Sequence, residues 1–154
     1  MITYFLPHLT SLSPSSASII LVSSGLAIIP FPRCANYSAS KAALRSLAWS
    51  LRTQLAGQDE TRHIRVIELI PPAVQTELHP SQADLVALGQ DKIGIPLEKY
   101  IDETWRELNP EEGGEIKNDI VHSAHGGRMD GIEGLRREGY EAFLAVMRKM
   151  GVKI

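Results

Sequence analysis

A chain of 154 residues, 44% hydrophobic and 22% charged, is long enough for one domain with a packed core and too short for two large ones. This composition excludes intrinsically disordered, collagen-like and disulfide-rich proteins. The net charge of -2 gives nucleic acid and anionic membranes no electrostatic attraction, so we expect a small-molecule partner. The single cysteine, Cys34, has no partner for an internal disulfide, which favours a reducing, cytoplasmic location.

Residues 1–32 contain no Asp, Glu, Lys or Arg. A secretory signal is excluded because there is no basic n-region and because polar residues fill positions 10–18. Residues 19–31 are apolar but are interrupted at 23–25, so they fall short of the ~20 apolar residues that a membrane-spanning helix needs. We therefore expect this charge-free segment to lie deep in the centre of a sheet.

The first half of the chain predicts a βαβ unit. Residues 4–12 are typical of the last turns of a helix, and the β-branched run 18–23 predicts a central parallel strand covered on both faces. A helix is expected over 38–56, with Gly57 as its cap and an apolar stripe of Leu44, Leu47, Ala48, Leu51 and Leu55. Residues 64–70 predict a second strand that Pro71 and Pro72 end. Strand, helix and strand in this order define an α/β fold with a parallel sheet.

Two helices are expected in the next segment. Ser81 and Asp84 have capping-box spacing at the start of a short helix over 81–88. Pro96 is favourable at the start of a second helix over 96–108, whose apolar side would carry Leu97, Tyr100, Ile101, Trp105 and Leu108.

The C-terminal part predicts an edge strand and a helix. The strand is expected within 116–122, after a turn at 111–115. The helix is expected over 132–150, and its apolar side would carry Tyr140, Phe143, Leu144 and Met147.

Three residues form a candidate catalytic set. Ser24 follows the first predicted strand, and ligands of open α/β sheets bind at the carboxyl ends of strands. Tyr37 and Lys41 are four apart at the start of a helix, so their side chains are neighbours. An ammonium beside a phenol favours the phenolate and lowers the phenol's pKa from its ordinary value of about 10, which makes it useful in acid–base catalysis.

The spacing of this set resembles the classical branch of the short-chain dehydrogenase/reductase family. Ser24, Tyr37 and Lys41 match the family's Ser and Tyr-x-x-x-Lys motif, with VSSG and YSASKAAL around them. The resemblance implies a Rossmann-like, doubly wound parallel sheet. It also implies that Tyr37 is the general acid or base and contacts the cofactor. Lys41 would lower the pKa of Tyr37 and bind the nicotinamide ribose, and Ser24 would hold the substrate oxygen.

A second motif follows the second predicted strand. Residues 71–76, PPAVQT, resemble the family's Pro-Gly-x-Val/Ile-x-Thr loop, and Pro72 replaces the usual glycine. The resemblance implies that Pro71, Val74 and Thr76 bind the nicotinamide end of NAD or NADP, without indicating which coenzyme. Because Pro has a fixed φ and no amide hydrogen, the path of this loop is expected to differ from the common form.

The family's glycine-rich G-x-x-x-G-x-G turn, which receives the cofactor pyrophosphate, does not occur in the chain. The nearest string, residues 126–134, has Glu133 in place of the last glycine and is expected to be a loop. The resemblance thus implies the C-terminal portion of a family member, with the N-terminal βαβ units missing. We expect one partial domain with a catalytic core at 1–76, a substrate region at 77–108 and a C-terminal extension at 109–154.

The leading hypothesis is an NAD(P)-dependent oxidoreductase of a carbonyl or secondary alcohol, assembled by family habit as a homodimer or homotetramer. The alternative is a non-catalytic fragment or pseudo-enzyme that dimerises through the 44–55 stripe. A third reading is an epimerase or dehydratase that uses the same Tyr and Lys.

Other chemistries are disfavoured by spacing. Ser24 lacks the first glycine of a hydrolase G-x-S-x-G motif. His122 and His125 have no further ligands at metal-binding spacing, so we expect a solvated pair and no metal. Cys34 is expected to pack near the site rather than to react.

Overall fold

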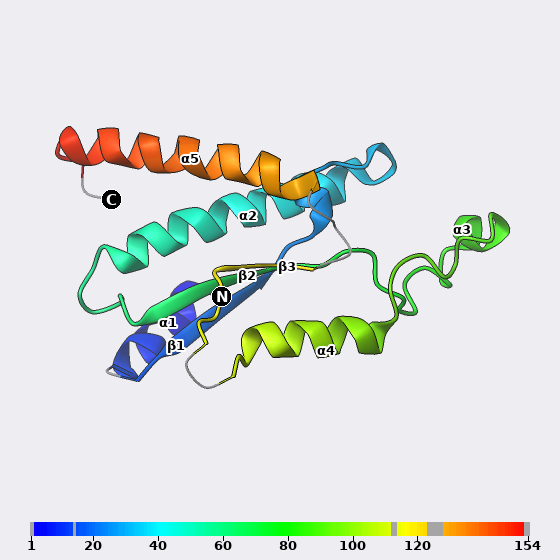
Figure 1. Cartoon of the computed structure of the whole chain (residues 1–154), viewed down its shortest axis with the longest axis horizontal. Helices are drawn as coiled ribbons and strands as arrows, with labels where there is room; N and C mark the ends of the chain where they lie inside the picture. The colour runs from blue at the N-terminus through cyan, green and yellow to red at the C-terminus, as the bar shows by residue number, and fades with distance from the viewer. Residues whose placement is uncertain (1, 14, 112–113, 123–127, 153–154) are drawn as a thin grey trace.

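The fold is a parallel sheet with helices on both of its faces (Figure 1). The computed structural model describes residues 2–13, 15–111, 114–122 and 128–152. The helices are α1 (Ile2–Ser11), α2 (Ala35–Ala56), α3 (Ala83–Ala87), α4 (Leu97–Leu108) and α5 (Arg128–Lys149), with short 3-10 turns η1 (Gly25–Ala27) and η2 (Pro32–Cys34). The strands are β1 (Ala17–Val22), β2 (Ile64–Ile70) and β3 (Asp119–Val121). The α/β class with a parallel sheet is therefore confirmed.

Strand β2 lies at the centre of the sheet, in the order β1-β2-β3. Ala17 pairs with Ile64 and Val22 with Leu69, while Glu68 pairs with Asp119 on the other side. All residues of β2 except Arg65 are buried, as expected for a β-branched run covered on both faces.

Strand β1 lies at an edge of the sheet among the described residues; the central position expected for it belongs to the complete fold that the resemblance implies. Its outer edge is unpaired in this part of the chain, and burial alternates along it. Ile20 and Val22 are each 47% exposed, because the helices that cover β1 lie on the opposite face.

The main core lies between the sheet and helices α1 and α2. Its buried members are Ala17, Ala48, Leu51, Leu55, Ile64 and Val66, against which Ile2, Leu6 and Leu9 of α1 pack. A smaller core of Ile67, Leu69 and Ile120 occupies the opposite face and contacts Leu108 at the end of α4. Ala48, Leu51 and Leu55 of the predicted stripe pack against the sheet as expected, whereas Leu47 faces solvent.

Helix α4 agrees with the expected boundaries but not with the expected packing. Leu108 contacts the small core, whereas Ile101 and Trp105 are exposed, so only part of the predicted apolar side is covered. The capping box before α3 is also wrong. Gln82 occupies the N-cap position without a side-chain bond, and the Ser81 hydroxyl donates to the Leu78 carbonyl instead.

Helix α5 lies along α2, on the side away from the sheet (Figure 1). It begins at Arg128, so residues 128–131, which we expected in a loop before the helix, are helical; residues 126 and 127 lie outside the described part. Leu144 is buried as expected, but Phe143 is exposed.

The remaining boundaries differ by small amounts. Strand β2 matches 64–70, β1 begins and ends one residue early, and α2 begins three residues early and ends with Gly57 at its C-cap. The predicted edge strand is present as β3, shorter than expected. Across the described ranges, we find no helix with the length and hydrophobicity needed to cross a membrane.

Candidate active site

Ser24 lies just beyond β1, where the backbones of residues 23–25 continue the parallel pairing with β2. The Ser23 amide donates to the Leu69 carbonyl at 2.9 Å, and the Gly25 amide donates to the Pro71 carbonyl at 3.0 Å. The Ser24 side chain is the N-cap of η1 and accepts a hydrogen bond from the Leu26 amide at 3.2 Å. Because this bond uses an oxygen lone pair, the hydroxyl hydrogen of Ser24 remains available to a ligand at the carboxyl end of the sheet.

Tyr37 and Lys41 lie in the first turns of α2. The Lys41 Nζ is 5.5 Å from the centre of the Tyr37 ring and donates to the Val22 carbonyl at 2.8 Å. Tyr37 is 47% exposed, so its phenol is open to a ligand. The Lys41 side chain is thus held at Val22, the last residue of β1, which stands two residues before Ser24. The described residues show no hydrogen bond between Ser24 and Tyr37.

The loop after β2 is held by the segment that precedes α4. Val74 and Ile95 form a parallel bridge, in which the Ile95 amide donates to the Ala73 carbonyl at 3.0 Å and the Gln75 amide donates to the Ile95 carbonyl at 2.9 Å. Since successive peptide groups point in opposite directions, the amide and carbonyl of Val74 face away from Ile95. The Thr76 side chain is exposed, and its oxygen accepts from the Leu78 amide.

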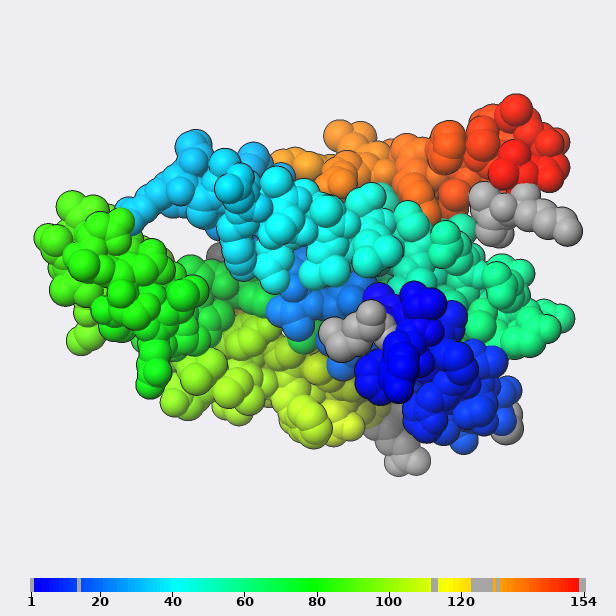
Figure 2. Space-filling view, turned by 180° about the vertical axis from the view of Figure 1, so that it is seen from behind, coloured from blue at the N-terminus to red at the C-terminus, as the bar shows by residue number. Residues whose placement is uncertain are grey.

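An ion pair joins the segment before α2 to α3. Arg33 binds Asp84, and Figure 2 shows the light-blue segment around residue 33 reaching the green segment around α3 at one end of the molecule. This contact places part of the predicted substrate region, 77–108, beside the segment that leads into Tyr37.

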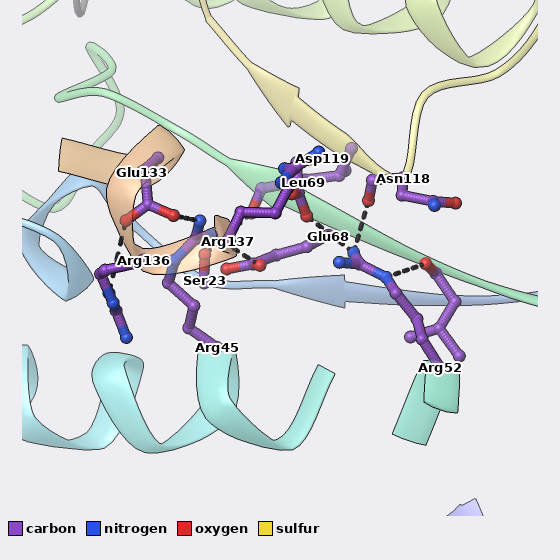
Figure 3. Close-up of polar contacts among 11 residues, drawn as sticks. Ser23, Arg45, Arg52, Glu68, Leu69, Asn118, Asp119, Glu133, Arg136 and Arg137 are labelled. Carbon is purple, nitrogen blue, oxygen red and sulfur yellow. Dashed lines mark hydrogen bonds and ion pairs between the residues drawn. The ribbon is translucent and has the colours of Figure 1, made fainter. Parts of the chain in front are cut away.

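A buried ion cluster was missed by the sequence analysis. Arg45, Glu68 and Glu133, from α2, β2 and α5, are joined by ion pairs (Figure 3). Their side chains are only 1%, 0% and 10% exposed. One signal was available, because Glu68 alternates with Ile64 and Val66 on a face that packs against a helix.

His122 is buried, and its Nε2 lies 2.5 Å from a carboxylate oxygen of Glu103 in α4. The expectation of a solvated His pair is therefore wrong for His122, while His125 lies outside the described residues. Within the described ranges, no group of three or more His, Cys, Asp or Glu residues is placed to hold a metal ion. Cys34 is half-buried at the N-cap position of α2.

The three-stranded parallel sheet, flanked by helices and with Ser24 just beyond the end of β1, has the architecture of a partial Rossmann-like α/β protein. Residues 1–85 match the short chain dehydrogenase family. A relative named "Uncharacterized oxidoreductase DltE", from Bacillus subtilis (strain 168), is 33% identical over 143 residues, which cover 93% of this chain and 50% of the relative. No solved structure gives a significant match.

The chain belongs to the short-chain dehydrogenase family, as the motif around Tyr37 predicts. It spans about half the length of the curated relative that it matches.

Proposed function

We propose that this protein is an NAD- or NADP-dependent oxidoreductase that acts on a carbonyl or a secondary alcohol, with Tyr37 as its general acid or base. The observation that carries the proposal is the position of Lys41, whose ammonium donates to the Val22 carbonyl at the end of β1 and lies 5.5 Å from the centre of the Tyr37 ring. In this position the ammonium would stabilise the negative charge that Tyr37 carries after it gives its proton to the substrate.

Ser24 and Tyr37 would act on the same substrate oxygen. The Ser24 hydroxyl would donate to that oxygen and orient it, and Tyr37 would deliver a proton to it during reduction or remove one during oxidation. The exposure of Tyr37 supports this role, because a buried phenol could not reach a substrate.

The loop after β2 fits the nicotinamide end of the cofactor. A carboxamide has an oxygen that accepts hydrogen bonds and an NH2 group that donates them. The loop offers it a donor in the Val74 amide, an acceptor in the Val74 carbonyl, and a group that can do both in the Thr76 hydroxyl. Pro71 would flank the ring, and the Lys41 ammonium would bind the ribose hydroxyls. When bound, the nicotinamide would give or accept the hydride.

The test uses the whole chain and measures NADH and NADPH binding by fluorescence, together with turnover of a panel of aldehydes and ketones. We expect binding of at least one coenzyme, and loss of turnover in Tyr37→Phe with coenzyme affinity retained. Tyr4→Phe is the matched control, because Tyr4 is 83% exposed on α1. Absence of both binding and turnover in the wild-type chain would refute the proposal for this polypeptide.

A second candidate is an interaction module. The outer side of α2 exposes Leu47 near Ala39 and Ala43, a surface on which a second copy could pack as a homodimer or homotetramer. Light scattering, together with the coenzyme titration above, separates the candidates: a dimer that binds neither coenzyme favours the module.

We also propose a cytoplasmic location for the oxidoreductase, which rests on the lone Cys34.

A further inference from the structure

The mechanism proposed above leaves one charged cluster near the site unused. Arg45 Nη1 lies 2.7 Å from Glu68 Oε2, and its Nη2 binds Glu133 (Figure 3). The other oxygen of Glu133 pairs with Arg136 at 3.3 Å, and Arg136 is half exposed. The cluster therefore has two cations and two anions, with one cation at its outer end.

A contribution to folding stability does not explain why this buried cluster is charged. Removing charges from water costs about as much as their pairing returns, and apolar side chains of similar size often serve as well. Arg45 Nε and Glu68 Oε1 also have no hydrogen-bond partner among the described residues, so the cluster is incompletely satisfied. A buried guanidinium can fix the relative position of the elements that it joins, because its planar fork binds carboxylates in a defined geometry. Apolar packing permits small shifts between the same elements.

The position of Arg45 shows which elements its directional bonds would hold in place. Tyr37, Lys41 and Arg45 recur at intervals of four, so they follow one side of α2. Glu68 lies in β2, two residues before the strand ends and the proposed nicotinamide loop begins. Glu133 lies near the start of α5. One guanidinium thus connects the helix that carries Tyr37, the strand that leads to the loop, and the C-terminal helix.

Helix α5 is attached to α2 at a second place. The Tyr140 hydroxyl donates to the Trp49 carbonyl at 3.2 Å and lies 2.9 Å from the Thr53 hydroxyl, and the Tyr140 and Trp49 rings are in contact. The Arg45–Glu133 pair is therefore the end of this contact that is nearer to the catalytic set.

We propose that Arg45 is a positioning residue, which Glu68 and Glu133 hold so that the rotation and depth of α2 keep Tyr37 and Lys41 in register with the strand ends. The inference rests on the proposed function. Helix α5 takes part through Glu133, which gives the C-terminal segment an indirect role in the acid–base step. A small rotation of α2 would move Lys41 relative to both the Val22 carbonyl and the Tyr37 ring.

The experiment compares Glu133→Gln with Glu138→Gln, an exposed position on the same helix. A third variant combines Arg45→Met, Glu68→Met and Glu133→Met, which removes the charges while keeping the volume. Circular dichroism and thermal unfolding establish that each variant folds. The first readout is the pH at which the Tyr37 phenol ionises, followed by ultraviolet absorbance as the difference from Tyr37→Phe. The second is the separate change of kcat and KM.

The direction of the ionisation change distinguishes positioning from a field effect. Loss of the Glu133 charge alone would favour the phenolate and move the ionisation to lower pH, whereas displacement of Lys41 moves it to higher pH. We expect a move to higher pH in Glu133→Gln and in the triple variant, with Glu138→Gln unchanged. We also expect kcat to fall by about 10-fold to 100-fold, with a smaller rise in the coenzyme KM because Lys41 would also bind the ribose.

An unchanged or lower ionisation pH in folded Glu133→Gln would overturn the inference, and so would wild-type kcat in the triple variant. Failure of the proposed function looks different: the wild-type chain would bind no coenzyme, whereas the ionisation comparison would still decide whether Glu133 positions the Tyr37–Lys41 pair.

Discussion

Gly94 lies where the segment before α4 comes closest to the loop after β2. Residues with a side chain rarely adopt its φ of +105°, and a Cβ placed there would lie 2.3 Å from the Ala73 carbonyl oxygen. The substitution Gly94→Ala must therefore push this segment away from Ala73. Because Val74 takes part in the bridge to Ile95, the proposed nicotinamide loop would move as well.

Two costs contribute to the effect of Gly94→Ala. A residue other than glycine in such a sparsely populated conformation costs roughly 1–3 kcal/mol. Relief of the clash breaks the backbone bonds from Ile95 to Ala73 and from Gln75 to Ile95, each of which contributes about 0.5–1.5 kcal/mol. We expect Gly94→Ala to lower the free energy of unfolding by about 3 kcal/mol, since both costs apply.

Gly89 provides the matched control. It also has a positive φ, +64°, but a Cβ there would meet no atom within 4 Å, so Gly89→Ala carries the conformational cost alone, about 1–2 kcal/mol. Urea unfolding measures both variants, and the midpoint should shift more for Gly94→Ala at an unchanged slope. Equal losses in the two variants would show that the close approach to Ala73 does not constrain the loop.

Two further predictions concern the packing of α2. Leu51→Ala should lower the free energy of unfolding by about 2–5 kcal/mol, because Leu51 is buried against the sheet. Leu47→Ala, on the exposed side of the helix, should lower it by less than about 1 kcal/mol. Similar losses in the two variants on chemical denaturation would contradict the assigned orientation of α2. Tyr140→Phe should cost about 1 kcal/mol and speed hydrogen exchange in α5, because it removes the hydroxyl that contacts Trp49 and Thr53. Unchanged exchange would mean that this contact does not hold α5.

The elements that the sequence predicts well are those with strong local periodicity. The boundaries of β2 are correct, and so is the end of α2. The start of α2 was placed late because Cys34 makes no side-chain cap, so no residue type marks the first turn. The start of α5 was missed because Gly131 and Gly134 are poor helix formers, by about 1 kcal/mol each relative to alanine, and contacts with α2 outweigh that preference.

Local spacing in the sequence indicates some side-chain neighbours of the candidate site and misses others. Ser24, Tyr37 and Lys41 lie close together in sequence, within one strand–helix connection, so their spacing indicates their juxtaposition. Arg45 binds Glu68 and Glu133, which are 23 and 88 residues away, and local spacing contains no information about such pairs. A charged residue on a helix is also assigned to solvent by default, because burial without a partner is costly.

Helix α2 contacts the sheet through two adjacent rows of side chains, of which the sequence pattern predicts only the apolar one. The second row is cationic. Lys41 donates to the Val22 carbonyl, and Arg52 donates to the Val66 carbonyl at 2.8 Å. Between them, Arg45 binds Glu68 (Figure 3). Each of these partners belongs to a strand. Because apolar contacts are non-directional, they would allow α2 to shift or rotate slightly on the sheet. Three directional bonds, spread over three turns of the helix, oppose such movement, and the first of them involves Lys41 of the proposed catalytic set.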